Sequence, residues 1–278
     1  MTPRNALHPG RELGPGYEVI EHLARSNVLD VYDAWSHERG CRVAVKTPTP
    51  ARLNDRKTVN ALLREGRILG VLTHPHIVRA YEVLREPRPA VVLETLSGET
   101  VAHLVHRRRR RLSAAELGML GVHLASAVGY LHGQGLLHLD LKPSNIVAER
   151  GKAKVIDMGV ARSPGRAPAE VGTWCYMAPE QARGGKLTPA ADVWGAGGVL
   201  YEAATGECAF DDDYDYPQLH RRADRVSLLR PRLPAQLRRI IDACLEPDPE
   251  ARPSVRELAA ACEEAAGLPA SERRLGRG

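Results

Sequence analysis

Apolar and polar positions follow two different patterns along the chain, and the change comes near residue 95. Before it, short segments with the alternation and β-branched content of strands surround one stretch of helical periodicity, residues 59–72. The strand-like segments are residues 17–23, 28–34, 42–46, 78–83 and 90–94. Beyond Gly98 the periodicity is mostly helical. The pattern predicts a small sheet-rich lobe with one main helix, followed by a larger, mainly helical lobe.

Helix-start signals mark the larger lobe. Ser113 with Glu116 forms a capping box, in which the hydroxyl and the carboxylate bind amide groups of the first turn, and Ser254 with Glu257 repeats it. Together with one more amphipathic stretch, these signals predict helices over residues 113–132, 237–245 and 254–265.

The two patterns set the expected organisation of an α+β chain with two lobes. We expect the small lobe over residues 17–94 and the large lobe over residues 99–268, joined by a hinge at 95–98. Residues 1–16 are left as an N-terminal arm, and residues 269–278 as a basic C-terminal tail. A cleft between two lobes is a natural place for a ligand.

Composition narrows the class of protein. The 278 residues carry a formal net charge of +5 and a pI near 9.0, which favours anionic ligands without demanding nucleic acid. Five cysteines are scattered without a Cys-x-x-Cys pair, as expected for reduced thiols. No apolar run approaches the eighteen or more residues of a membrane span, and the N-terminus lacks the layout of a signal peptide. We expect a soluble, cytoplasmic protein and leave its oligomeric state open.

Candidate chemistry concentrates in residues 138–145, His-Leu-Asp-Leu-Lys-Pro-Ser-Asn, and in residues 157–159, Asp-Met-Gly. They offer a carboxylate to orient a hydroxyl, a fixed cation, and the carboxylate and amide oxygens that bind Mg²⁺, an inventory suited to phosphoryl transfer. Earlier in the chain stand Val-Ala-Val-Lys at 43–46 and Arg-Glu-Gly at 64–66. Residues 172–180, Gly-Thr-Trp-Cys-Tyr-Met-Ala-Pro-Glu, close the set.

In order and spacing, these motifs resemble the protein kinase superfamily, and within it the bacterial eukaryotic-like serine/threonine kinases, over residues 17–268. The resemblance implies a two-lobed kinase fold whose small lobe holds an antiparallel sheet. It also implies use of ATP with Mg²⁺ or Mn²⁺. The Ala-Pro-Glu motif and the segment before it imply a protein substrate, because small-molecule kinases of similar fold generally lack them.

The resemblance implies a role for each motif residue. Asp140 accepts or orients the proton of the substrate hydroxyl, and Lys142 neutralises charge on the transferring phosphoryl group and is typical of serine/threonine kinases. Lys46 holds the α- and β-phosphates of ATP and is itself held by Glu65. The two implied metal ligands are Asn145 and Asp157.

Contacts to the nucleotide follow from the same resemblance. Apolar side chains sandwich adenine, the backbone of Glu94 and Leu96 hydrogen-bonds it, and Leu93 guards the back of the pocket. The full set of implied nucleotide contacts is Lys46, Ala24, Ser26, Val31, Ala44, Leu93, Glu94, Leu96 and Val147.

The phosphate loop departs from the kinase pattern. Relatives place three glycines there, because glycine lets backbone amides approach the phosphates closely. In this chain Ala24, Ser26 and Leu29 occupy the three glycine places. We therefore hypothesise weakened nucleotide affinity or slow turnover, with catalysis retained.

The catalytic loop departs at one position. Leu139 follows His138 where relatives carry an arginine that pairs with a phosphorylated residue of the activation segment, here residues 157–180. Between Asp157 and Thr173 the only hydroxyl residue is Ser163. We predict activity that does not depend on phosphorylation of the activation segment, and interpret His138 as structural.

Other polar groups receive structural interpretations. The resemblance pairs Glu180 with Arg252 and makes Asp192 an anchor of the catalytic loop. The five arginines at 107–111 are expected in a solvated loop, so nucleic acid is not expected as a partner. The aspartates at 211–213 and 215 either select basic substrates or keep a loop soluble.

The sequence as a whole predicts a serine/threonine protein kinase. The main alternative is a pseudokinase or weakly active signalling scaffold that binds nucleotide poorly, which the missing glycines favour and the complete polar set opposes. A nucleic-acid-binding module that uses the arginine run is a third alternative.

Overall fold

The computed structural model describes residues 5–210 and 216–268, and its internal contacts divide the chain into two units. The small unit comprises Met1–Ser97 together with Asp157–Gly159, and the large unit comprises Gly98–Ile156 and Val160–Gly278. The aspartates at 211–213 and 215 lie outside the described residues, as does the predicted C-terminal tail.

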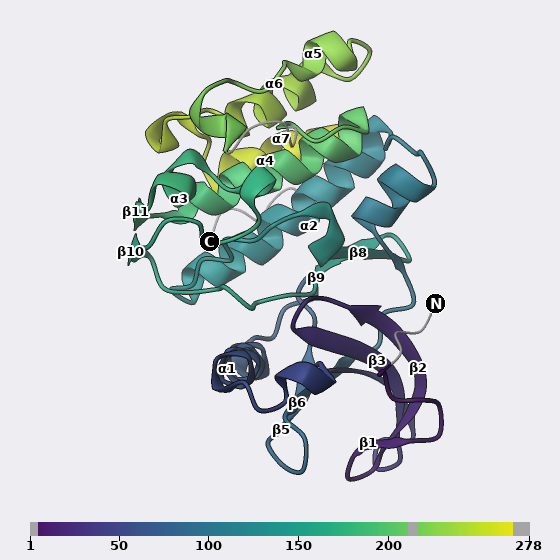
Figure 1. Ribbon diagram of the computed structural model, residues 1–278. Coiled ribbons are helices and arrows are strands. Elements are labelled where there is room, and N and C mark those ends of the chain that lie inside the picture. Colours follow the sequence, from purple (N-terminus) through teal and green to yellow (C-terminus); the bar gives the residue numbers. More distant parts are fainter. Residues whose placement is uncertain (1–4, 211–215, 269–278) are drawn as a thin grey trace. The chain divides into compact units, whose positions relative to one another are not determined.

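A six-stranded antiparallel sheet and one long helix make up the small unit (Figure 1). The sheet order is β1-β2-β3-β4-β6-β5, and helix α1 (Arg56–Val71) packs against β5 and β6. The strands are β1 (Glu12–Gly14), β2 (Tyr17–Arg25), β3 (Leu29–Ser36), β4 (Cys41–Pro48), β5 (Ala80–Leu84) and β6 (Ala90–Glu94).

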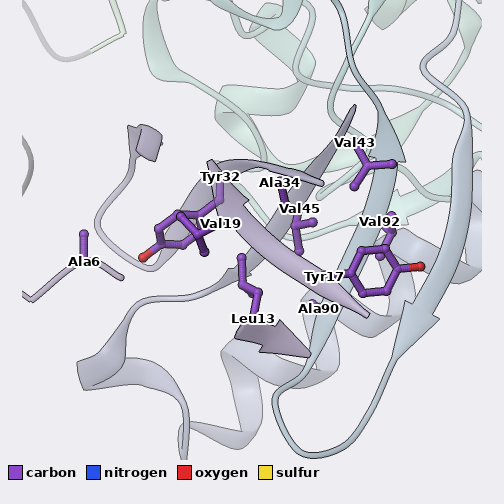
Figure 2. Packing of buried hydrophobic residues seen from close by; sticks show 10 residues of the cluster. All are labelled: Ala6, Leu13, Tyr17, Val19, Tyr32, Ala34, Val43, Val45, Ala90 and Val92. Carbon is purple, nitrogen blue, oxygen red and sulfur yellow. The ribbon is translucent and has the colours of Figure 1, made fainter. Parts of the chain in front are cut away.

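Successive side chains of β4 alternate between the apolar core of this unit and the face that carries Lys46. Val43 and Val45 are fully buried in the apolar cluster that Figure 2 shows. Ala44 and Lys46 therefore lie on the opposite face of the strand, because successive side chains of a strand point to opposite sides. Burial of Val43 and Val45 thus decides where the Lys46 side chain lies.

Helix α1 begins at a cap and approaches the sheet closely. The carboxylate of its N-cap residue, Asp55, accepts a hydrogen bond from the backbone N–H of Lys57. A Cβ at Gly66 would lie 2.7 Å from side-chain atoms of both Val83 and Val91, so only glycine allows this spacing. The neighbouring Glu65 is consequently 2% exposed.

Helices dominate the large unit. Helices α2 and α7 pack together, and α4 contacts both α2 and α6, as Figure 1 shows. The helices are α2 (Ala114–Gly133), α3 (Pro179–Arg183), α4 (Pro189–Thr205), α5 (Val226–Leu229), α6 (Ala235–Cys244) and α7 (Val255–Ala265). Its short strands are β7 (Glu99–Thr100), β8 (Ile146–Glu149), β9 (Lys152–Val155), β10 (Gly165–Ala167) and β11 (Gly185–Leu187).

Helix α2 is, within residues 5–210 and 216–268, the one helix whose length and apolar composition would suffice to cross a membrane. Of the most apolar 18-residue window of this helix, 56% is buried inside the protein, as is usual for a core helix. The expected absence of a membrane span stays a prediction.

The predicted α+β architecture is confirmed, with an antiparallel sheet in the small unit and a mainly helical large unit. Both predicted capping boxes are present, at Ser113 and at Ser254. Before Tyr17, β1 pairs with β2 and Ala6 joins the apolar cluster. The predicted division of the chain into an arm, two lobes, a hinge and a tail stays a prediction.

Candidate active site

Lys46 lies between two carboxylates in the small unit. Its Nζ is 2.8 and 2.9 Å from the two carboxylate oxygens of Glu65 and 3.1 Å from Oδ2 of Asp157. Burial disfavours the ammonium, but the charges of Glu65 and Asp157 outweigh it and raise the pKa of Lys46. Lys46 is therefore a fixed cation across the physiological pH range.

The Asp157-Met158-Gly159 turn is held from both ends. The Gly159 N–H donates to Oδ1 of Asp157 at 2.7 Å, and the Met158 N–H donates to Oε1 of Glu65 at 3.3 Å. Met158 is fully buried, as expected for an apolar residue filling the place of phenylalanine. The Asp157 side chain keeps 36% of its surface exposed.

The β2–β3 hairpin, at the place of the glycine-rich loop, is closed by its own hydrogen bonds. The Ser26 N–H donates to the Leu29 carbonyl at 2.8 Å. The Ser26 hydroxyl oxygen accepts the N–H of Leu29 at 3.0 Å and that of Val28 at 3.3 Å. These amides are used inside the turn, whereas a glycine loop offers its amides to phosphate.

A buried carboxylate braces the same hairpin. Asp30 has no exposed surface and accepts two hydrogen bonds from Arg25, from Nε at 2.6 Å and from a terminal nitrogen at 2.8 Å. His22 Nε2 lies 2.8 Å from Oδ1 of Asp30. Burial opposes ionisation of Asp30, yet the hydrogen bonds from Arg25 and His22 outweigh it and lower its pKa.

The register of the strands places several of the implied nucleotide contacts on one face of the sheet. Val31 lies opposite both Ala24 and Lys46, and Ala44 lies opposite Leu93. Residues opposite each other in antiparallel strands share a face, and so do residues two apart on one strand. This face is the one opposite Val43 and Val45.

Three other implied nucleotide contacts lie off this face. Glu94 ends β6 and Leu96 follows it, and the Glu94 backbone N–H donates to the Arg79 carbonyl at 2.9 Å. That amide is therefore already engaged. Val147 belongs to β8 of the large unit and is 7% exposed.

Three side chains of the large unit contact Asp140, two from the catalytic loop and one from the activation segment. Lys142 Nζ is 2.9 Å from Oδ2 of Asp140, and Asn145 Nδ2 donates to the same oxygen at 3.1 Å and to the Asp140 carbonyl at 3.0 Å. The Thr173 hydroxyl donates to Oδ1 at 2.6 Å. With its nitrogen used in this way, the Asn145 amide keeps its oxygen for a ligand.

Asp192, at the start of α4, fixes the backbone of the catalytic loop. Its carboxylate accepts the N–H groups of Leu139 at 2.7 Å and of His138 at 2.9 Å, and His132 Nε2 lies 2.8 Å from it. His138 is 1% exposed, and its Nδ1 accepts the N–H of Asp140. These groups shape the loop that carries Asp140.

An ion pair joins the Ala-Pro-Glu motif to the segment before α7. Arg252 donates to both oxygens of Glu180, at 2.6 and 2.8 Å, and its guanidinium carbon lies 4.9 Å from the centre of the Trp194 ring. The Arg252 side chain has no exposed surface. Because the charge is buried and paired, removal of either partner would leave an unpaired charge and destabilise the large unit.

Glutamates partly neutralise the arginine run. Arg108 pairs with Glu99, and Arg110 lies 2.5 Å from Glu116. All five arginines are exposed. The arrangement agrees with a solvated surface, and nucleic acid as a partner stays untested.

Sequence reasoning missed two buried polar groups, one that braces the β2–β3 hairpin and one that contacts the catalytic loop. One is Asp30, whose only signal is a carboxylate between apolar residues of a strand. The other is Gln181, 2% exposed, whose signal is its place three residues after the N-cap residue Ala178, where a glutamine oxygen can accept the N-cap N–H.

The candidate metal ligands are an amide and a carboxylate. Within the described ranges, no group of three or more acidic, histidine or cysteine side chains could hold an ion. Asn145 of the large unit and Asp157 of the small unit, an amide and a carboxylate, remain the ligands that the kinase resemblance implies for Mg²⁺.

Comparison with known proteins gives relatives that are all named as protein kinases. A probable serine/threonine-protein kinase of Streptomyces coelicolor is 30% identical over 259 residues, which cover 87% of this chain and 38% of that protein. Serine/threonine-protein kinase PkaA of the same organism is 32% identical, with 90% and 50% covered. CBL-interacting protein kinase 4 of Oryza sativa is 34% identical, with 90% and 58% covered.

These relatives are longer than this chain, which spans between 38% and 58% of their length. The family model described as "Protein kinase domain" matches residues 17–261, a range that includes Lys46, Asp140 and Asp157. The chain therefore belongs to the protein kinase family.

Proposed function

We propose that this chain transfers the γ-phosphoryl group of ATP to serine or threonine hydroxyls of protein substrates. The observation that carries the proposal is the cluster of Asp140, Lys142 and Thr173. It places a carboxylate, an ammonium and a hydroxyl within 2.6 to 2.9 Å of one another. Relatives whose names say serine/threonine-protein kinase support the choice of acceptor.

Each residue contributes through its charge. Asp140 takes the proton of the attacking hydroxyl, and Lys142 offsets negative charge on the phosphoryl group. Lys46, held by Glu65, binds the α- and β-phosphates. Because these charges are already fixed by hydrogen bonds, little reorganisation is needed when the substrate arrives.

Asn145 and Asp157 would hold the divalent cation. The open oxygen of the Asn145 amide and the carboxylate of the partly exposed Asp157 side chain fit Mg²⁺ or Mn²⁺. A cation bound there supplies neutralisation of the phosphate oxygens. Asp157 also contacts Lys46, so the residue that holds the metal is tied to the residue that holds the phosphates.

Activity should not require phosphorylation of the activation segment. Leu139 is 3% exposed and has no charged group with which to bind a phosphate. Treatment of the purified protein with phosphatase, checked by intact mass, should leave the transfer rate unchanged, and Ser163→Ala should behave like wild type. Loss of activity that returns when Ser163 is phosphorylated would contradict this part of the proposal.

A pseudokinase or weakly active scaffold is the second candidate. The closed hairpin favours it, because the N–H groups of Val28 and Leu29 are engaged by the Ser26 hydroxyl. Weak nucleotide binding would follow from those engaged amides.

One assay separates the two candidates. Transfer of radiolabelled phosphate from ATP to a generic basic protein is measured for wild type and for Asp140→Asn. Transfer by wild type that falls by at least about 100-fold in Asp140→Asn supports the kinase. Equal background with both proteins supports the scaffold.

A further inference from the structure

Gln181 in α3 joins two segments of the large unit through a buried amide. Its Oε1 accepts the N–H of Ala178 at 3.1 Å, which caps its own helix. Its Nε2 donates to the carbonyl of Leu139 at 2.9 Å and to the carbonyl of Val171 at 2.7 Å. Both amide hydrogens are thereby used, one on the catalytic loop and one on the activation segment.

The backbone of Gln181 adds to the same contact. Its carbonyl accepts the N–H of Glu170 at 3.0 Å. Residues 170 and 171 are therefore held by both the main chain and the side chain of one residue. A buried amide that bonds two carbonyls fixes their separation more tightly than either bond alone, since moving one segment breaks both bonds.

Leu139 has an unusual backbone at the point of contact. Its φ of 65° lies in the left-handed region, which a leucine adopts only when its surroundings impose it. Asp192 binds its N–H and Gln181 binds its carbonyl. The peptide on either side of Leu139 is thus fixed, and Asp140 is the next residue.

Gly172 shows how closely the two segments approach. Its φ is 119°, and a Cβ there would lie 2.5 Å from the Leu139 carbonyl oxygen and 3.3 Å from the Gln181 Nε2. The next residue, Thr173, bonds Asp140. The two carbonyls that Gln181 binds therefore lie one residue before Asp140 and two residues before Thr173.

We propose that Gln181 is a positioning residue that holds the unphosphorylated activation segment against the catalytic loop. It does so by a neutral amide, at the residue where relatives use arginine and a phosphate. The inference rests on the proposed kinase function for its effect on rate. The contact itself is measurable without that function.

Gln181→Glu is the sharpest variant. It keeps an oxygen for the Ala178 N–H, so the helix cap is retained, but it replaces the donor by an oxygen that faces two carbonyls. Gln218→Glu is the matched control. Gln218 is also 2% exposed and its Nε2 also donates to two carbonyls, those of Trp174 and Met177, without contacting Leu139.

Two measurements are compared. Hydrogen exchange followed by mass spectrometry reports the amides of residues 165–173, and steady-state kinetics separates kcat from KM. For Gln181→Glu we expect faster exchange in this segment and a kcat about 10- to 100-fold lower, with the KM for ATP within about twofold of wild type. For Gln218→Glu we expect a higher KM for the peptide substrate and unchanged exchange at residues 165–173.

Three outcomes would overturn the inference. In the first, Gln181→Glu has the same exchange and the same kcat as wild type. In the second, Gln181→Glu and Gln218→Glu show the same changes in exchange and kcat. In the third, Gln181→Glu loses activity only through a raised KM for ATP. If Gln181→Glu does not fold, Gly172→Ala replaces it, because the added methyl group would clash with the Leu139 carbonyl. Gly172→Ala must show the same fall in kcat. A wild-type kcat in that variant would overturn the inference. A wild type without transferase activity contradicts the proposed function, while the exchange measurement still decides the contact.

Discussion

The Thr173 hydroxyl donates a 2.6 Å hydrogen bond to Oδ1 of Asp140. The same hydroxyl accepts a 2.6 Å hydrogen bond from Nζ of Lys142. A hydroxyl has one hydrogen and can accept as well, so Thr173 bridges the base and the cation of the proposed reaction. Because Thr173 belongs to the segment expected to bind peptide, the bridge links substrate binding to the proton acceptor.

Loss of this hydroxyl should lower the rate more than the affinity. We expect Thr173→Ala to reduce kcat by about 10- to 100-fold, since hydrogen bonds to charged groups contribute about 1.5–3 kcal/mol. Thr173→Ser keeps the hydroxyl and should stay within about threefold of wild type. Steady-state kinetics with a peptide substrate checks both variants, and equal rates for Ala and Ser would contradict the role.

Removing the charge of Glu65 should weaken the hold on Lys46. In Glu65→Gln the Lys46 ammonium keeps Asp157 as a charged partner and loses Glu65, and breaking a buried pair costs about 3–5 kcal/mol. We expect kcat/KM for ATP to fall by about 10- to 100-fold. The control Glu82→Gln changes a carboxylate of β5 that bonds Tyr17, and its kcat/KM for ATP should match wild type. A fall in both variants would mean a general loss of stability.

The ion pair of Asp30 should contribute to stability in a pH-dependent way. The pKa of Asp30 is lowered in the folded state, so its contribution is present above the ordinary value of 3.8 and is lost as the pH falls through the lowered pKa. Asp30→Asn should reduce the free energy of unfolding by about 1–3 kcal/mol at pH 7.

Urea denaturation between pH 7 and pH 3 measures this contribution. The difference in the free energy of unfolding between wild type and Asp30→Asn should shrink as the pH falls, because protonated Asp30 is uncharged, like asparagine. A difference that grows as the pH falls would show that another group determines the effect.

Glycines restored to the hairpin should improve nucleotide binding. Ser26→Gly with Leu29→Gly removes the hydroxyl that engages the N–H groups of residues 28 and 29. The freed amides can then approach phosphate. We expect the KM for ATP to fall by about tenfold, although the glycine at position 29, in β3, costs about 0.5–1 kcal/mol of stability. An ATP affinity equal to that of wild type would remove the hypothesis of a weakened phosphate loop.

Much of the architecture could be predicted because it depends on local periodicity. The strand that carries Lys46 and the helix that carries Glu65 follow from alternation and from the 3.6-residue repeat. Strand β1 could not be predicted, since three residues carry too little pattern and pair only because β2 offers an edge. The hydrogen bonds of Ser26 within the turn could not be predicted either, because a serine at that place could equally have bound phosphate.

By itself, the sequence determined which chemical groups this protein carries and in what order. Asp140, Lys142 and Asn145 stand close together in the chain, so short-range spacing sufficed to propose them as a set. Only the tertiary structure decided that Asp30 closes the hairpin and that Gln181 joins Leu139 to Val171. The last contact depends on a carbonyl group, which every residue has, and on a buried amide 42 positions away. Such partners are chosen by folding geometry and burial, and residue type alone does not reveal them.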